Sequence, residues 1–313
     1  MATATALPTD VRPAADEQRP TTLRARLWAR PGGRVALILV ALLILVAILA
    51  PVLTGLEGQD PNTYHDGLLN SATGGPASPF GGISTAHWLG VEPTTGRDVF
   101  ARLVYGARIS LIVAGGATLG QLLLGLLVGL AAGLGNRWVD SLLSRFTDLA
   151  LSFPFLFLAI ALLAIVPQDF PRPLLLCLIL AGFGWSYIAR IVRAETLVLR
   201  ERDFVSAARL YGASTWRIAR REILPGLVAP VATYTALAIP SNMVSESGLS
   251  FLGLGVQPPT PSWGQMLSTA TTWFQTDPEY VLVPALTLLL VVFAFTALGE
   301  EVRRAADPKG LHR

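Results

Sequence analysis

Long apolar runs dominate the chain, and six of them are long enough to be considered as membrane-spanning helices. A helix needs about 20 apolar residues to cross the ~30 Å hydrocarbon core of a bilayer. The fourth run is the weakest because it is short and ends at Arg190. The pattern predicts an all-α polytopic membrane protein with six transmembrane helices. The runs are Val35–Leu53, Ile109–Leu134, Leu149–Val166, Leu174–Ala189, Ile223–Ser245 and Val281–Gly299.

Composition excludes most soluble folds. The chain has 313 residues, of which 52% are hydrophobic and 14% charged, with a mean hydropathy of +0.54. A soluble domain carries roughly 25% charged residues. The first apolar run is interpreted as an uncleaved span rather than a signal peptide, because 34 residues precede it and no clear cleavage site follows it.

Arginine and lysine cluster in alternate connections between the runs. They are frequent before the first span, in the loop from Arg190 to Glu222 and after Gly299, whereas Gly55–Leu89 contains neither residue. Positive residues in short loops stay in the cytoplasm, so both termini are expected there. The net charge of +3 reflects this topology and gives no reason to expect nucleic-acid binding.

These observations divide the chain into five parts. The external segment is rich in Gly, Pro, Ser and Thr and contains Trp88 and the turn Gly96–Phe100, so it is expected to form a small ordered cap or to lie over the outer surface. The parts are a disordered cytoplasmic N-terminal arm (1–34), a first transmembrane helix (35–53), an external segment (54–104), a five-helix core (105–304) with a loop at 190–222, and a cytoplasmic tail (305–313).

Glycine and proline mark the second and fifth spans. Gly125, Gly129 and Gly133 recur every four residues, so they share one helix face and let a neighbouring helix approach closely. We interpret this stripe as packing rather than as part of a permeation path. Prolines bend membrane helices, which suits a segment that lines a cavity or moves. Those of the fifth span are Pro225, Pro230 and Pro240.

Residue chemistry gives little support to other classes of protein. Cys177 is the one cysteine, so no disulfide can form within the chain, and His65, His87 and His312 are interpreted as surface histidines rather than metal ligands. An intramembrane enzyme would need a nucleophile–base pair or a metal motif, and the sequence has no HExxH, no GxSxG and no histidine in any span.

Charged residues also disfavour an ion-driven secondary transporter, which usually has charged groups at mid-membrane. The central parts of the spans contain none. Arg145 and Asp148, near the inner end of the third span, are interpreted as a local ion pair rather than a proton relay. A purely structural scaffold would not explain the loop that precedes the fifth span.

That loop, Asp203–Pro225, carries the most informative pattern. We expect Asp203 to be the N-cap of a short helix in which Ala207 and Ala208 leave room for a partner surface. Gly212 can end the helix in a left-handed conformation. Ser214 can then cap a second helix that continues through Trp216, Ile218 and Ile223 to the membrane boundary at Pro225.

Several longer motifs occur in a fixed order along the chain. They are HWLG at 87–90, GRDV at 96–99, YGARISL at 105–111, the EAA-like loop described above, LSFLGLGVQPPTPSWG at 249–264 and DP at 307–308. With them the chain resembles the second permease subunit of the dipeptide/oligopeptide/nickel class of ATP-binding cassette importers, from the first span to Pro308. The resemblance implies the type I permease fold and a bacterial cytoplasmic membrane location.

The resemblance also implies partners. These are a homologous permease subunit in a heterodimer, two cytoplasmic P-loop ATPases, an extracytoplasmic solute-binding protein and membrane lipid. The chain has no GxxxxGK[ST] loop, so ATP and Mg²⁺ belong on the ATPases and this chain has neither catalytic residues nor a cofactor. Di- or oligopeptides are the expected cargo, and nickel complexes or another small solute are the alternative. The residues expected to contact the ATPase are Asp203, Phe204, Ser206, Ala207, Ala208, Tyr211, Gly212, Leu224 and Pro225.

Two residues of the loop depart from the family pattern. Ser206 stands where the family has glutamate, and Glu222 stands where it usually has histidine. With Asp203 as N-cap, a glutamate at 206 would complete a capping box, so serine is expected to cost the helix about 0.5–1 kcal/mol.

Polar residues near the outer end of the fifth span are candidates for the translocation path or its gate. They are Asn242, Ser245 and Glu246. An ionisable residue inside a membrane span is a functional candidate by default. Glu246 could bind a cationic or amine group in transit, or it could cap a helix or pair with an arginine of an external loop and hold the exit closed.

Overall fold

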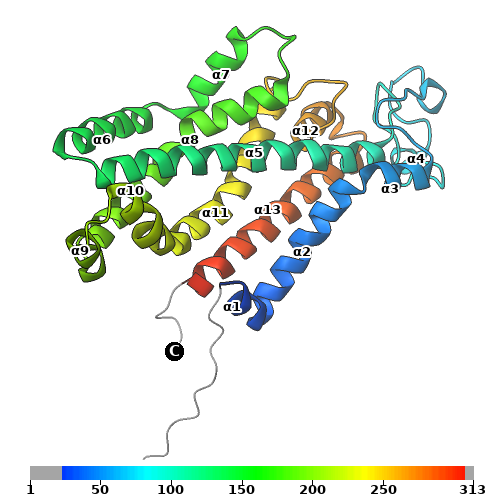
Figure 1. Ribbon diagram of the computed structural model, residues 1–313. Helices are drawn as coiled ribbons and strands as arrows, with labels where there is room; N and C mark the ends of the chain where they lie inside the picture. The colour runs from blue at the N-terminus through cyan, green and yellow to red at the C-terminus, as the bar shows by residue number, and fades with distance from the viewer. Residues whose placement is uncertain (1–22, 307–313) are drawn as a thin grey trace, which may run out of the picture.

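The computed structural model describes residues 23–306, and it is a bundle of helices with no strand in that range (Figure 1). The long helices are α2 (Pro31–Ile48), α5 (Val99–Leu134), α6 (Arg137–Ser152), α8 (Arg172–Arg200), α11 (Leu224–Phe251) and α13 (Pro278–Ala306). The short ones are α1 (Leu23–Ala29), α3 (Ala50–Glu57), α4 (Pro79–Gly82), α7 (Phe155–Ile165), α9 (Asp203–Leu210), α10 (Thr215–Ile218) and α12 (Trp263–Ala270).

The helices α5 and α8 form the most extensive pair of the bundle. An added Cβ at Gly125, Gly129 or Gly133 would come within 2.5–2.6 Å of α8, at Ile188, Val192 and Thr196 respectively. The packing interpretation of the glycine stripe is therefore confirmed. Since both sets of numbers rise together, α5 and α8 run parallel, and the chain must cross the membrane once between them.

Replacing a glycine of the stripe by alanine should clearly destabilise the folded protein. At Gly129 an alanine Cβ would lie 2.7 Å from the backbone oxygen of Ala189, which cannot move aside, so Gly129→Ala should lower the free energy of unfolding by about 1–3 kcal/mol. The matched control is Gly182→Ala, at an exposed position of α8 where an added Cβ meets no atom within 4 Å. Helix propensity should make that variant neutral or up to about 1 kcal/mol more stable. Equal thermal unfolding midpoints for the two variants in detergent would contradict this account.

The return crossing is a broken span rather than the continuous helix expected at Leu149–Val166. α6 and α7 meet at an angle of 81°. Pro154 has no N–H group, and the residue before a proline avoids the helical conformation, as the extended backbone of Phe153 (φ −83°, ψ 131°) shows. Together, α6 and α7 still return the chain to the side of the membrane on which α8 begins.

Two ion pairs hold α6 against α8. Asp140 accepts two hydrogen bonds from the guanidinium of Arg193, and Asp148 lies 2.7 Å from Arg190. The expected local pair of Asp148 with Arg145 is therefore wrong. Asp148 therefore pairs with Arg190 of the neighbouring helix α8, and not with Arg145 of its own helix.

Other boundaries differ from the expectations by a few residues. Among residues 23–306, five helices are long and apolar enough to cross a membrane, and a sixth span results if α6 and α7 are counted as one. The arm expected to be disordered up to residue 34 already contains α1 and the start of α2, while residues 1–22 lie outside the described part, as do 307–313 with the DP motif. The first span is interrupted at Leu49, and α11 continues past Pro230 and Pro240.

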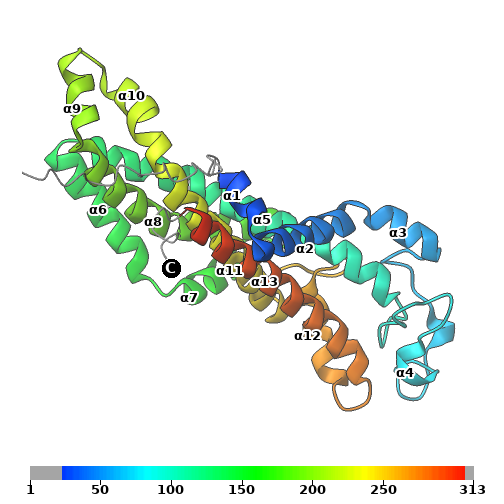
Figure 2. The ribbon, with the colours of Figure 1, turned by 90° about the horizontal axis from the view of Figure 1, so that it is seen from below.

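The bundle has two chemically distinct ends. Figure 2 shows α9 and α10 at one end and α3, α4 and α12 at the other. The first end, named here the arginine-rich end, also contains the start of α2 and the end of α13, which Arg30 and Glu301 bring together. The other end, named the loop end, contains the connections at 58–98 and 252–277.

Candidate functional site

The short helix α9 begins one residue earlier than the sequence indicated. Its N-cap is Arg202, whose carbonyl oxygen accepts hydrogen bonds from the N–H groups of Val205 (3.0 Å) and Ser206 (3.1 Å). Asp203 is therefore the first helical residue and not the N-cap. Its carboxylate still interacts favourably with the positive end of the helix dipole. Position 206 is the fourth helical residue, so the predicted capping box, and the cost of losing it, do not apply.

The end of α9 matches the expectation. Gly212 adopts a left-handed conformation (φ +75°), and its N–H group donates to the carbonyl of Arg209 at 2.9 Å. The N–H group of Ala213 donates to the carbonyl of Ala208 at 3.0 Å, which completes a Schellman motif. Ser214 then caps α10 by accepting from the N–H group of Arg217. A turn built this way fixes the angle between α9 and α10.

One side chain seats α9 on the bundle. Val205 is fully buried, and it joins a core that contains Ile188 and Val192 of α8 and Leu227 of α11. Ile218, the last residue of α10, and Ile223, in the turn that follows it, are buried in the same core. α9 is therefore attached to both helices that flank its loop.

The opposite side of α9 is exposed. Phe204 is 45% exposed, and Tyr211 is 91% exposed. Ala208 is half-buried, while the others predicted to contact a partner lie at the surface. These exposed residues are Asp203, Ser206, Ala207, Gly212, Leu224 and Pro225. Leu210, which is 88% exposed, was not predicted from the sequence, and Trp216, which is 74% exposed, was expected only as part of the second helix. The signal in the sequence was that these apolar residues do not lie on the same helix face as the buried Val205.

The connection from α10 into the membrane is continuous. Residues Ala219–Ile223 form one π-helical turn that leads directly into α11, so the second helix does not stop at Pro225. On the other side, the guanidinium of Arg200 donates to the carbonyl of Gly133 at the end of α5 (2.9 Å). No flexible linker separates α9 from the spans on either side.

A cavity of about 450 Å³ opens beside α11 within the bundle. Asn242 and Ser245 line it, as the path hypothesis requires, together with Gln121, Tyr187, Tyr234 and Ser241, which the sequence analysis missed. Asn242 donates to Thr118 (2.9 Å) and exchanges hydrogen bonds with the amide of Gln121 (3.0 and 3.2 Å). The wall therefore offers amide, hydroxyl and aromatic groups without a charged side chain.

Glu246 does not line this cavity. It is fully buried, and its carboxyl group accepts hydrogen bonds from Ser110 of α5 (2.9 Å) and from Ser247 and Ser250 of α11. Among the described residues its partners are hydroxyl groups, so the predicted external arginine partner is wrong. The geometry fits a link between α5 and α11 better than contact with cargo.

Comparison with known proteins decides the family. Residues 125–308 match the family described as "Binding-protein-dependent transport system inner membrane component". The chain belongs to this permease family. The resemblance noted in the sequence is confirmed, and the long helices are those of an ATP-binding cassette permease.

The chain is similar to two named permeases along most of its length. It is 38% identical to the dipeptide transport system permease protein DppC of Alkalihalophilus pseudofirmus, over 88% of this chain and 85% of that protein. It is 39% identical to the glutathione transport system permease protein GsiD of Pectobacterium atrosepticum, over 73% and 74%. An inward-facing structure of the methionine transporter MetNI shares the fold, with 18% identity, a TM-score of 0.53 and coverage of 66% of this chain and 96% of that one.

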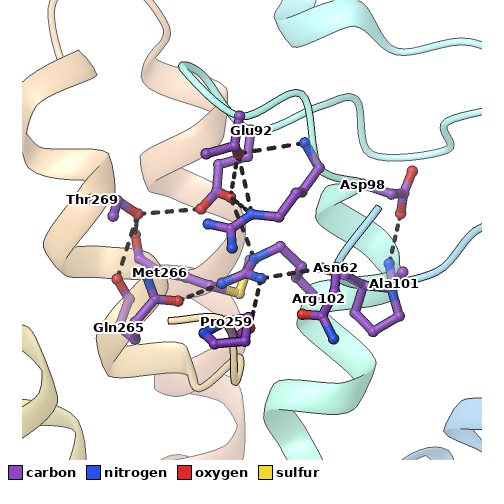
Figure 3. Close-up of polar contacts among 12 residues, drawn as sticks. Asn62, Glu92, Asp98, Ala101, Arg102, Pro259, Gln265, Met266 and Thr269 are labelled. Carbon is purple, nitrogen blue, oxygen red and sulfur yellow. Dashed lines mark hydrogen bonds and ion pairs between the residues drawn. The ribbon is translucent and has the colours of Figure 1, made fainter. Parts of the chain in front are cut away.

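The loop end of this permease is organised around one buried carboxylate. Glu92 lies 2.7 Å from Arg97 and 3.5 Å from Arg102, and all three side chains are at most 4% exposed. Figure 3 shows Arg102 reaching from α5 to the carbonyl of Pro259 (3.2 Å) and the amide oxygen of Gln265 (2.6 Å). Burial alone would raise the pKa of Glu92, but Arg102, the Tyr280 hydroxyl and Arg97 hold it below its usual value. This cluster joins α5, α12 and α13.

The permease motifs at this end have structural roles. Asp98 caps α5 by accepting from the N–H group of Ala101 (2.7 Å) and also contacts Nδ1 of His87 (2.8 Å). His87 is buried, and its ring centroid is 5.0 Å from that of His65, so the interpretation of His87 as a surface residue is wrong. His312 lies outside the described residues.

A neighbouring carboxyl group should make the stability of this end depend on pH. Burial, and to a lesser extent Asp98, raise the pKa of Glu57 from 4.5 to about 7, although the N–H group of Trp88 opposes the shift. Glu57 therefore takes up a proton on folding, and the free energy of unfolding should fall as pH rises from about 4.5 to 7.

Thermal unfolding of the wild type and Glu57→Gln across that pH range tests this. The glutamine keeps the acceptor for Trp88 but cannot titrate, so its midpoint should depend less on pH. Both proteins keep the neighbouring Asp98 and His87, so the comparison isolates the effect of the Glu57 carboxyl group. Parallel curves for the two proteins would contradict the prediction.

Proposed function

We propose that this permease imports peptides across the bacterial cytoplasmic membrane with energy from ATP hydrolysed on partner chains. The observation that carries the proposal is the seating of α9. Val205 and the core beneath it attach the helix to α8 and α11, while Phe204, Leu210 and Tyr211 face outward. A partner that gripped this outward face would move two spans directly.

The proposed assembly follows from the chemistry that the chain needs from others. A homologous permease subunit completes the path, and two P-loop ATPases bind the arginine-rich end, with ATP and Mg²⁺ on those chains. A solute-binding protein docks at the loop end. Positive residues favour the cytoplasmic side, so the arginine-rich end and both termini lie in the cytoplasm.

The cavity supports peptide cargo. Its volume of about 450 Å³ lies in the range of small-molecule sites, and its serine and tyrosine hydroxyl groups can exchange hydrogen bonds with a peptide backbone. Relatives of this chain are named for dipeptide and glutathione transport. Asn242 and Ser245 would lie on the path, and Glu246 would hold α5 against α11 behind it.

Uptake in membrane vesicles tests the proposal. Vesicles that contain the chain with its co-expressed partners should accumulate a labelled dipeptide when ATP and the binding protein are supplied. Accumulation should persist with a protonophore and stop with a non-hydrolysable ATP analogue. Uptake that follows the proton gradient instead would refute the ATP-driven importer and favour a secondary transporter.

A further inference from the structure

Arg108 lies within the YGARISL motif, and none of the contacts described above explains it. At the loop end the other arginines have oxygen partners: Arg97 and Arg102 contact Glu92, and Arg172 donates to the carbonyls of Leu163 and Val166. Within the described residues the guanidinium of Arg108 has no hydrogen bond or ion pair. Its one directed contact is with the ring of Tyr105, 5.7 Å away. The fixed positive charge therefore lacks an anion.

An apolar groove of about 430 Å³ starts at this side chain. Its walls come from four helices, with Ile48 on α2, Ile112 on α5, Ile239 on α11 and Phe295 on α13. Arg108 is the one polar residue of the lining. The groove continues past Gly115, where an added Cβ would meet no atom within 4 Å. It therefore combines one positive charge with a long apolar surface.

The position of Arg108 along α5 places that charge at the membrane boundary. Arg108 directly precedes the uncharged run Ile109–Leu134, which spans the hydrocarbon core. Ile239 and Phe295 lie well inside their own spans, so the groove runs from the interface toward the middle of the bilayer. The charge therefore lies at headgroup depth and the apolar part at acyl-chain depth.

We propose that this groove is a binding site for one glycerophospholipid of the outer leaflet. The phosphate pairs with the guanidinium of Arg108, which suits the planar fork of that group. An acyl chain follows the groove past Gly115 toward Ile239 and Phe295. The lipid fills the space between α2 and α11 and supplies the anion that Arg108 lacks. A protein partner would have to place an acidic group at the membrane boundary to do the same.

Lipid titration of the purified, delipidated permease assembly in detergent tests the site, with bound lipid counted by native mass spectrometry. The probe is phosphatidylglycerol, and the comparison is diacylglycerol with the same acyl chains, which lacks the phosphate. The wild-type protein should bind phosphatidylglycerol more tightly than diacylglycerol. Arg108→Gln should weaken that binding about tenfold, and Arg108→Lys should weaken it less.

Two further variants separate the site from general effects. Arg145→Gln removes an exposed arginine of α6 at the other end of the bundle and should leave binding unchanged. Gly115→Phe fills the groove without altering charge and should also weaken binding. Equal binding by Arg108→Gln and Arg145→Gln, or equal binding of both lipids by the wild type, would overturn the proposal. So would a photo-crosslinker at position 115 that captures the second permease subunit instead of lipid.

Discussion

Glu92→Gln is expected to destabilise the folded permease by about 3–5 kcal/mol. The glutamine has nearly the size of the glutamate but carries no charge, so Arg97 and Arg102 would remain buried at 3% and 0% exposure without their counter-charge. Breaking a buried pair by removing one partner is costly because the remaining charge cannot regain its water. The loss should appear as a lower thermal midpoint and a poor yield of monodisperse protein.

The chain offers a matched control in Glu300→Gln. Glu300 also contacts two arginines, Arg303 and Arg304, but the three side chains are 34–60% exposed. Exposed pairs of this kind contribute about 0–1 kcal/mol. The two substitutions are chemically identical and differ in burial. Similar midpoints for both variants would show that the Glu92 cluster does not stabilise the loop end.

Tyr211→Ala is expected to weaken the association with the ATPase by about tenfold to a hundredfold. Tyr211 is 91% exposed at the end of α9, so its removal should leave the fold intact. Exposed aromatic side chains that become buried in a partner often contribute 2 kcal/mol or more to binding. The measurement is the amount of ATPase recovered with tagged permease, together with ATP-dependent uptake in vesicles.

Phe274→Ala is the control for this experiment. Phe274 is 63% exposed, but it lies at the loop end, far along the chain from α9. Its loss should not change the recovery of ATPase. If both variants recover as much ATPase as the wild type, the outward face of α9 is not the contact, and the proposed coupling through this helix fails.

Much of the fold could be predicted because each signal was local. The apolar runs located the spans, and the glycine stripe predicted the close approach that Gly125, Gly129 and Gly133 make to α8. Gly212 and Ser214 specify the turn after α9 through their own backbone and hydroxyl groups. Such features depend on residues within one continuous segment of the chain, so the sequence contains the needed information.

The missed features depend on contacts between distant segments. Asp148 has Arg145 nearby in sequence, but the partner that reaches it is Arg190, on a helix whose position no local pattern specifies. Gln121 and Tyr187 line the cavity only because α5, α8 and α11 converge there. Ser110 likewise meets Glu246 across two spans. Spans can be read from hydropathy, whereas their mutual orientation requires the packed structure.

The break between α6 and α7 has a consequence for the biogenesis of the permease. With 11 residues α7 is about 16 Å long, roughly half the thickness of the hydrocarbon core, and α6 carries several charged residues. Neither helix is an adequate insertion signal by itself. The two ion pairs that join α6 to α8, Asp148 with Arg190 and Asp140 with Arg193, can form only after α8 has been synthesised. The parallel arrangement of α5 and α8, and with it the side of the membrane on which α9 lies, therefore depends on the insertion of this one marginal segment.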